Sequence, residues 1–233
     1  MRSKNYYPLM LDLQDKPCVI IGGGAVAERK AESLIEAGAS VTVISPVCTH
    51  KLVQWAESGV LEAVYETYRT QMPQVQRAVL VFAATDRPDI NEAVRLEAEA
   101  LGKLVNVADD AERSGFIVPA AVRRGRLLLA VSTAGASPAV ARKVKQELEQ
   151  SFGEEYGEYL ELLQELRLIV QRMVSDTKVR QEMFRRMLDW ELLPWIRSGE
   201  LQAAEKDELI RRIELEPTPG TMERIRIWIQ HHT

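Results

Sequence analysis

Three small residues near the start of this 233-residue chain have the spacing of a turn that holds a diphosphate. Gly22, Gly24 and Ala27 form the pattern G-x-G-x-x-A, directly after a β-branched apolar run. The first glycine permits a tight turn, the second lets a phosphate approach the backbone, and the alanine lets the next helix pack closely on the sheet. The amides that open this helix, at Ala25 and Val26, then face the negative charge. The pattern predicts a dinucleotide site.

The residues that would contact the ribose of such a nucleotide follow a second apolar run. An Asp or Glu normally stands at this position. This chain has Ser45, Pro46 and Val47 instead. Ser45 can hydrogen-bond a ribose hydroxyl, and no arginine follows in the same loop to bind a 2′-phosphate. We therefore predict that the cofactor is NAD rather than NADP.

Further polar residues follow two later apolar runs. Thr85 and Asp86 follow one run, and Asn106, Asp109 and Asp110 lie at the end of the next. Ligands of an open parallel sheet bind beyond the carboxyl ends of its strands, so we expect these loops to meet the nucleotide. A carboxylate in such a cleft can accept a proton. The alternative is that these side chains cap a turn or a helix.

The first half of the chain alternates between strand-like and helix-like segments. Residues 17–21, 40–44, 60–65, 78–84 and 103–107 are predicted strands. Helices are predicted from residue 25 to about 37, over 49–58 and over 90–101. This alternation predicts an α/β fold with a Rossmann-like, doubly wound parallel sheet. Residues 6–16 are expected to form a short leading strand or an arm.

The pattern changes after residue 110. Residues 116–122 lead into the basic stretch 123–126, a predicted strand at 127–132 and a predicted helix at 139–151 that Ser137 caps. From residue 154 onward only helical periodicity remains, with Pro194, Pro217 and Pro219 as expected breakers. We therefore expect three domains: 1–113 binding the nucleotide, 114–152 as a central segment, and 153–233 as an all-helical C-terminal domain.

Composition excludes several classes of function. The sequence is 46% hydrophobic and 27% charged with a net charge of −4, which suits a globular protein and gives no nucleic-acid footprint. The apolar runs are too short to span a membrane, and the N-terminus lacks a secretory signal core. Two cysteines and three histidines show no metal-ligand spacing. We expect a cytoplasmic protein without a metal site, a membrane partner or a nucleic-acid partner.

Five motifs occur in a fixed order along the chain. Together they resemble the precorrin-2 dehydrogenase family, the N-terminal module of siroheme synthases, some members of which are also sirohydrochlorin ferrochelatases. The resemblance covers about residues 8–150. The five motifs lie at residues 22–30, 83–86, 106–109, 116–120 and 132–138.

This resemblance implies an activity and an assembly. It implies NAD-dependent oxidation of precorrin-2 to sirohydrochlorin by a homodimer whose segment 114–152 dimerises and whose active site lies near the subunit interface. It also implies that Asp109 is the catalytic residue, which we assign as general base, with Asp110 as second choice. Thr133 corresponds to a position that is serine in some members and is linked there to modification.

The basic residues of the central segment suit the proposed substrate, because precorrin-2 carries many carboxylates. Arginine binds carboxylates in a bidentate manner. The candidate substrate-binding residues are Arg123, Arg124, Arg142, Ser132 and Thr133. The alternative for the cations of this segment is a solvated helix face that pairs with neighbouring glutamates.

Three other functions are considered. A bifunctional enzyme would also insert Fe²⁺ into sirohydrochlorin, and Asp109 could serve both reactions. A regulator would bind the nucleotide or the tetrapyrrole without turnover. A dehydrogenase of a small hydroxy acid would normally need a histidine or lysine in the cleft, and no histidine lies between His50 and His231.

Overall fold

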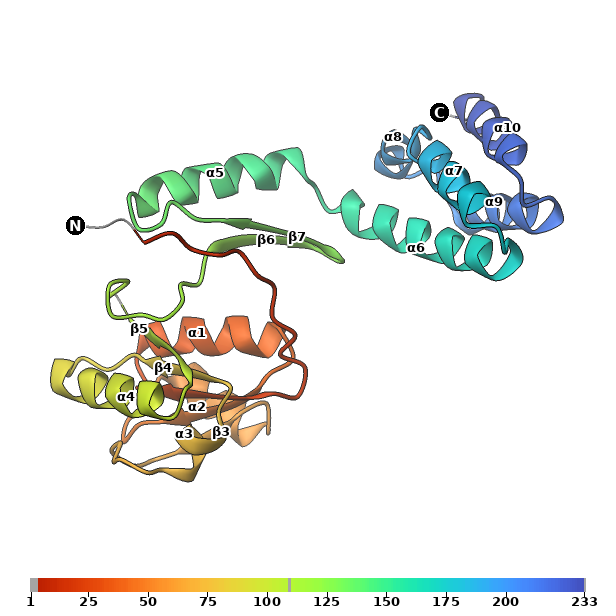
Figure 1. Cartoon of the computed structure of the whole chain (residues 1–233). Coiled ribbons are helices and arrows are strands. Elements are labelled where there is room, and N and C mark those ends of the chain that lie inside the picture. Colours follow the sequence, from red (N-terminus) through yellow and green to blue (C-terminus); the bar gives the residue numbers. More distant parts are fainter. Residues whose placement is uncertain (1–3, 109, 233) are drawn as a thin grey trace. The chain divides into compact units, whose positions relative to one another are not determined.

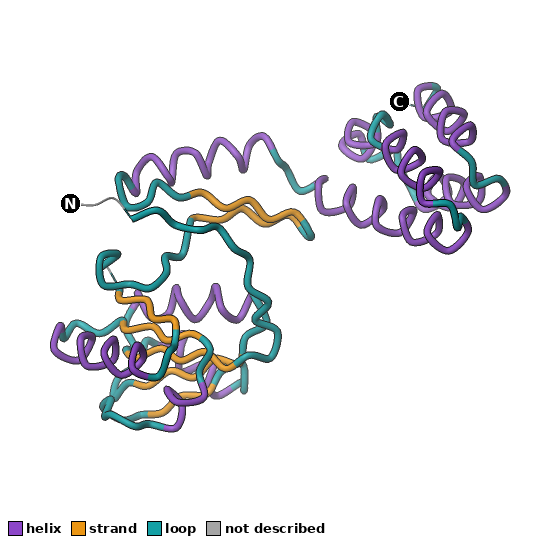
Figure 2. The backbone as a smooth tube through the Cα atoms, viewed as in Figure 1, coloured by secondary structure: helices purple, strands orange, loops and turns teal. Residues whose placement is uncertain are grey.

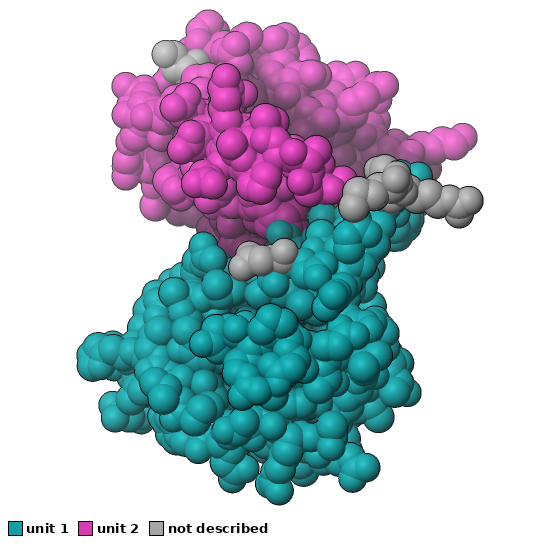
Figure 3. Space-filling view, turned by 90° about the vertical axis from the view of Figure 1, so that its left-hand side faces the viewer, with its two compact units in different colours: residues 1–118 teal, residues 119–233 magenta. Residues whose placement is uncertain are grey.

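The computed structural model describes residues 4–108 and 110–232. Figure 1 and Figure 2 show its helices and strands. The chain divides into two compact units, residues 1–118 and 119–233 (Figure 3). The finer division into three domains stays a prediction. Within the described ranges, no helix is both long enough and apolar enough to cross a membrane.

Five parallel strands form the sheet of the first unit, in the order β3-β2-β1-β4-β5. The strands are β1 (Pro17–Ile21), β2 (Ser40–Ile44), β3 (Glu62–Val64), β4 (Leu80–Ala83) and β5 (Leu104–Val107). The strand order reverses at β1, which lies between β2 and β4. A ligand is therefore expected beyond the carboxyl end of β1. This topology confirms the predicted Rossmann-like α/β fold.

Helices cover both faces of the sheet. They are α1 (Ala25–Glu36), α2 (His50–Glu57), α3 (Pro73–Arg77) and α4 (Pro88–Ala100). Successive strand side chains point to opposite faces, so β1 places Cys18 and Ile20 in one apolar cluster and Val19 and Ile21 in another. Residues of α1 and α2 belong to the first cluster, and residues of α3 and α4 to the second. Burial on both faces explains why these strands are continuously apolar in sequence.

The N-terminal residues form an arm and not a strand. None of residues 4–16 is part of a strand, and the side chains of Tyr7, Leu9 and Met10 are exposed. Lys4 ties the start of this arm to the first unit, because its Nζ donates to the carbonyl oxygens of residues 111, 112 and 114. Of the two predicted alternatives, the arm is the one that the structure has.

The second unit begins with an antiparallel hairpin of β6 (Ala120–Arg124) and β7 (Leu127–Val131). The apolar pattern of the sequence predicts only the second of these strands. Gly125 turns the hairpin with a φ of 53°. Helix α5 (Pro138–Ser151) follows, and the predicted cap is present: the Ser137 hydroxyl accepts a hydrogen bond from the Val140 N–H at 3.3 Å.

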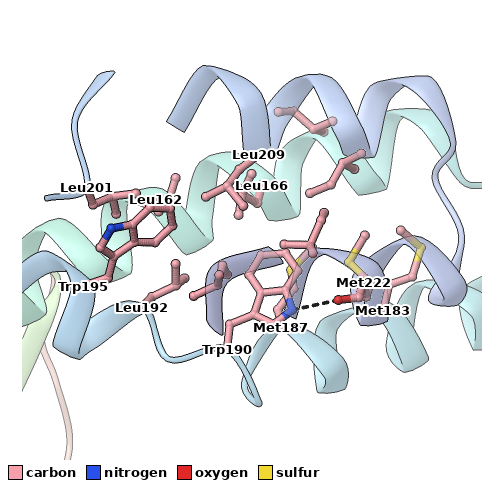
Figure 4. Packing of buried hydrophobic residues seen from close by; sticks show 14 of the residues in the cluster. Leu162, Leu166, Met183, Met187, Trp190, Leu192, Trp195, Leu201, Leu209 and Met222 are labelled. Carbon is pink, nitrogen blue, oxygen red and sulfur yellow. Dashed lines mark hydrogen bonds between the residues drawn. The ribbon is translucent and has the colours of Figure 1, made fainter. Parts of the chain in front are cut away.

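Five helices form the rest of the second unit: α6 (Glu155–Met173), α7 (Thr177–Met187), α8 (Leu192–Ser198), α9 (Ala203–Leu215) and α10 (Pro219–Gln230). They enclose one apolar core, in which the Trp190 Nε1–H donates to the Met222 carbonyl oxygen at 3.0 Å (Figure 4). The predicted all-helical region is confirmed. Pro194 and Pro219 stand in the first turns of α8 and α10, where a proline costs no hydrogen bond, so they start helices instead of breaking them.

Candidate dinucleotide-binding site

The glycine turn after β1 is closed on one side and open on the other. A Cβ on Gly22 would lie 2.2 Å from the Ala84 carbonyl oxygen, and one on Gly23 would lie 2.1 Å from the Val47 carbonyl oxygen. Gly22 also has a φ of 124°, which disfavours any side chain. A Cβ on Gly24, in contrast, would meet nothing within 4 Å. The turn therefore packs against the loops after β2 and β4 and leaves its Gly24 side free for a ligand.

The helix that follows begins without a side-chain cap. Gly24 is the N-cap residue of α1, and the first hydrogen bond of the helix runs from the Glu28 N–H to the Gly24 oxygen at 3.0 Å. The amides of Ala25, Val26 and Ala27 precede that bond, so they have no partner within the helix. They also stand at the positive end of the helix dipole. Open space beside uncapped amides fits a diphosphate.

A pocket of about 460 Å³ opens at this edge of the sheet. Its volume falls within the usual range for small-molecule sites. The predicted residues that line it are Gly22, Gly24, Ser45, Pro46, Val47, Thr85 and Asp86. Ala25 and Val26 follow directly in the first turn of α1. Asn106 does not line this pocket.

Ser45 holds the loop after β2 in place. Its hydroxyl donates to the Val47 carbonyl oxygen at 2.7 Å, and the residue is 9% exposed. The hydroxyl proton is used in this bond, so Ser45 can offer a ribose hydroxyl only an acceptor. The pocket thus keeps a hydrogen-bond acceptor where related folds have a carboxylate.

Thr85 is fixed by a residue that the sequence analysis did not single out. Asn91, on α4, accepts hydrogen bonds at its Oδ1 from the Thr85 N–H (3.1 Å) and hydroxyl (2.7 Å). Its Nδ2 donates to the Thr85 carbonyl oxygen at 3.0 Å. The loop after β4 therefore has a defined conformation before any ligand binds.

The loop after β3 supplies a wall of the pocket that the sequence analysis also missed. Thr67 and Tyr68 line the pocket, and the buried Tyr68 hydroxyl donates to the carboxylate of Glu97 on α4. The same carboxylate accepts the Gln71 N–H at 2.8 Å, where Gln71 has a φ of 65°. Burial, followed by the hydrogen bond to Glu97, raises the pKa of Tyr68, so its hydroxyl stays protonated. The carboxyl-edge rule applied to the third strand would have pointed to this loop.

The loop after β5 carries the predicted catalytic residue. Asp109 lies outside the described residues. Asn106 is buried, and its Nδ2 donates to the Phe116 carbonyl oxygen at 3.0 Å. Asp110 accepts the Arg113 N–H at 3.0 Å and pairs with its guanidinium at 3.3 Å. Asn106 and Asp110 thus stabilise the conformation of this loop. This agrees with the alternative prediction that polar side chains here cap a turn.

The candidate substrate-binding arginines of the second unit differ in what they contact. The Arg124 Nε donates to the Phe152 carbonyl oxygen at 3.1 Å and lies 3.3 Å from the Glu154 carboxylate, with a side chain 16% exposed. Arg123 and Arg142 are exposed and form no ion pair with a described residue. Arg124 therefore ties the hairpin to the start of the helical region, while the other two are free to bind a ligand.

The remaining candidates of that unit serve local structure. Thr133 and Ser137 bond reciprocally: the Ser137 N–H donates to the Thr133 hydroxyl at 3.2 Å, and that hydroxyl donates to the Ser137 carbonyl oxygen at 3.1 Å. The Ser132 hydroxyl accepts the Ala134 N–H at 3.0 Å. On α5, two lysines pair with glutamates one turn on, as the solvated-face alternative expects. Among the described residues, no three His, Cys, Asp or Glu side chains gather as metal ligands would.

Comparisons with known proteins agree with this geometry. Residues 9–120 match a family described as putative NAD(P)-binding, and residues 124–151 match one described as sirohaem biosynthesis protein central. The siroheme synthase of Chromobacterium violaceum is 36% identical over 208 residues, which are 89% of this chain and 44% of that protein. The siroheme synthase of Methylobacillus flagellatus is 36% identical over 197 residues, which are 84% and 42% of the two chains. The chain thus spans less than half the length of these relatives.

A solved structure extends the likeness over almost the whole chain. SirC, a precorrin-2 dehydrogenase, matches with a TM-score of 0.74 and 26% identity, over 90% of this chain and 99% of that one. The family description, putative NAD(P)-binding, confirms the prediction that the cofactor is a pyridine nucleotide. The chain belongs to the siroheme biosynthesis family that includes the siroheme synthases and the precorrin-2 dehydrogenase SirC.

Proposed function

We propose that this protein oxidises precorrin-2 to sirohydrochlorin with NAD. The observation that carries the proposal is the uncapped N-terminus of α1 beside the open face of Gly24, in a pocket at the switch point of the sheet. When bound there, NAD supplies a hydride acceptor. The amides of Ala25 and Val26 would hold its diphosphate, and the loops after β2, β3 and β4 would enclose its adenosine end.

Asp109 is our proposed general base. The oxidation removes a hydride and a proton, and the proton needs an acceptor near the nicotinamide. Asp109 follows Ala108, whose N–H donates to the Ala83 carbonyl oxygen at 2.8 Å and so continues the pairing of β5 with β4. Its neighbour Asp110 is engaged by Arg113. These two facts favour Asp109 as the carboxylate that takes the proton.

The preference for NAD over NADP has support from the cation beside the pocket. Arg87 lines the pocket, but its guanidinium is paired with Asp89 at 2.6 Å. A 2′-phosphate at this guanidinium would meet the negative charge of the Asp89 carboxylate. Ser45 adds no positive charge, and its hydroxyl proton is already bonded. NAD carries no 2′-phosphate and meets no such repulsion.

The proposed homodimer involves the central segment 114–152. Helix α5 has fourteen residues, none of which is buried, and the apolar Val140 is 50% exposed. A second copy of the chain would cover this face. We further propose that Arg123 and Arg142 bind carboxylates of the substrate, with Ser132 and Thr133 shaping the adjacent turn and Arg124 supporting the hairpin.

The decisive test follows formation of NADH from precorrin-2 by absorbance. The wild-type protein should form NADH with NAD, and Asp109→Asn should lower kcat at least about a hundredfold while leaving NAD binding unchanged. Protein that binds NAD but forms no NADH would instead favour the non-catalytic regulator. A second incubation with sirohydrochlorin and Fe²⁺ separates a bifunctional enzyme from a dehydrogenase alone.

A further inference from the structure

A second pocket lies within the second unit, where the reaction proposed above uses no residue. It has a volume of about 220 Å³. Its walls are mostly apolar and come from α6 and α7, including Leu163, Phe184 and Leu188. Two cations complete it: Arg126, in the turn of the β6–β7 hairpin, and Arg167 on α6. The pocket thus combines an apolar floor with two guanidinium groups.

Arg167 differs from the other arginines of the helical region in its contacts with the protein. Among the described arginines of residues 153–233, it alone makes neither a hydrogen bond nor an ion pair with the protein. On the same helix, Arg172 pairs with Glu214 at 3.0 Å. The guanidinium of Arg167 instead lies 4.4 Å from the centroid of the Phe184 ring. A stacked guanidinium keeps the N–H groups at its edge free for a carboxylate.

Arg126 brings a second free cation to the same pocket. It is exposed and forms no ion pair with any residue that the structure describes. Neither guanidinium is paired with a carboxylate of the described residues, so both are available to an anionic ligand. The remaining walls are apolar except for Gln164, so the ligand that complements them carries a carboxylate on a largely apolar body.

We propose that this pocket docks one carboxylate-bearing ring of the tetrapyrrole substrate, as a site separate from the nucleotide pocket. The proposal rests on the proposed function for the identity of the ligand. The pocket is smaller than sites that bury a whole drug-sized molecule, so it takes one ring edge and not the macrocycle. The ring contacts Leu163 and Leu188, and its carboxylate contacts Arg167 and Arg126.

The test measures binding of uroporphyrin, a stable porphyrin with carboxylates on every pyrrole ring, to the full chain by fluorescence titration. Arg167→Gln should weaken binding about tenfold, the loss of one charge-assisted hydrogen bond. The matched control is Arg172→Gln on the same helix, which should bind as the wild type does. Equal affinity of Arg167→Gln and wild type, or an equal loss in both variants, would overturn the proposal.

A second pair of variants tests the charge at the rim. Leu188 is 66% exposed, so its replacement leaves the core intact. Leu188→Glu should weaken uroporphyrin binding more than Leu188→Gln, because only the former repels carboxylates. Equal affinities would contradict the proposal. NADH formation from precorrin-2 is measured in parallel: its absence would refute the proposed function, whereas normal turnover with unchanged uroporphyrin affinities would refute only the docking site.

Discussion

Replacing Gly24 by alanine should weaken nucleotide binding while leaving the fold intact. Gly24 has φ −85° and ψ −174°, a conformation that alanine adopts without strain. The added Cβ would meet no protein atom within 4 Å. It would stand in the space through which a diphosphate must approach the first amides of α1. The variant therefore separates the role of this residue in binding from any role in folding.

The expected effect on stability is close to zero. Alanine is a poorer N-cap than glycine by about 0.5–1 kcal/mol. It also lowers the entropy of the unfolded chain, which stabilises the folded protein by about 0.4–1 kcal/mol. The two contributions cancel. For binding, losing one charge-assisted hydrogen bond to the diphosphate costs about 1.5–3 kcal/mol, which raises the Kd for NAD about tenfold to a hundredfold.

The assay combines thermal denaturation with an NAD titration, and Gly22→Ala is the contrasting variant. Its Cβ would lie 2.2 Å from the Ala84 carbonyl oxygen at a φ of 124°, so it should lower the free energy of unfolding by at least about 1–3 kcal/mol. Gly24→Ala should melt like the wild type and bind NAD poorly. Wild-type affinity in Gly24→Ala, or a melting temperature as low as that of Gly22→Ala, would refute the reasoning.

Three further variants test other parts of the structure. Glu97→Ala frees the loop after β3, so the KM for NAD should rise about fivefold with kcat unchanged; an unchanged KM would show that the loop needs no such support. Trp190→Phe removes the bond to the Met222 carbonyl oxygen and should cost about 1–3 kcal/mol of unfolding free energy, measured by urea denaturation, without altering NAD affinity. Arg197 lowers the pKa of Glu155 from its ordinary 4.5, so this pair stabilises the fold above that pH and ceases to do so as the pH falls below it. The melting temperature should therefore fall more on acidification in the wild type than in Glu155→Gln, and equal slopes would contradict this.

Local sequence patterns predicted most of the fold, because glycines mark the ends of helices and apolar runs mark buried strands. Gly38 and Gly102 end α1 and α4 with positive φ, as their places in the sequence indicate. Strand β6 was missed because its register depends on pairing with β7, and its last residues are both arginines. Pairing across a hairpin is tertiary information, which a short run with two charges does not reveal.

The nucleotide pocket was predicted only where residues directly follow a strand. Ser45 and Thr85 are such residues, since parallel strands end at one edge of the sheet. Asn91 and Glu97 lie on α4; Asn91 reaches back six residues to Thr85, and Glu97 contacts Gln71 in a loop that is distant in sequence. Periodicity places such residues on a helix, but it does not say which loop their side chains reach.

The basic residues of the second unit show why net charge alone does not locate an anion site. Arg123 and Arg124 are adjacent in sequence and equal in charge, yet Arg124 is neutralised by Glu154 and held by a backbone carbonyl, while Arg123 is exposed. Arg167 is surrounded in sequence by glutamates but pairs with none of them, since its guanidinium stacks on Phe184. A cation is available to a carboxylate ligand only where no carboxylate of the protein is already paired with it. By that criterion, the exposed face of β6 and the α6–α7 pocket are better candidates for carboxylate recognition than the lysines of α5, which already have partners.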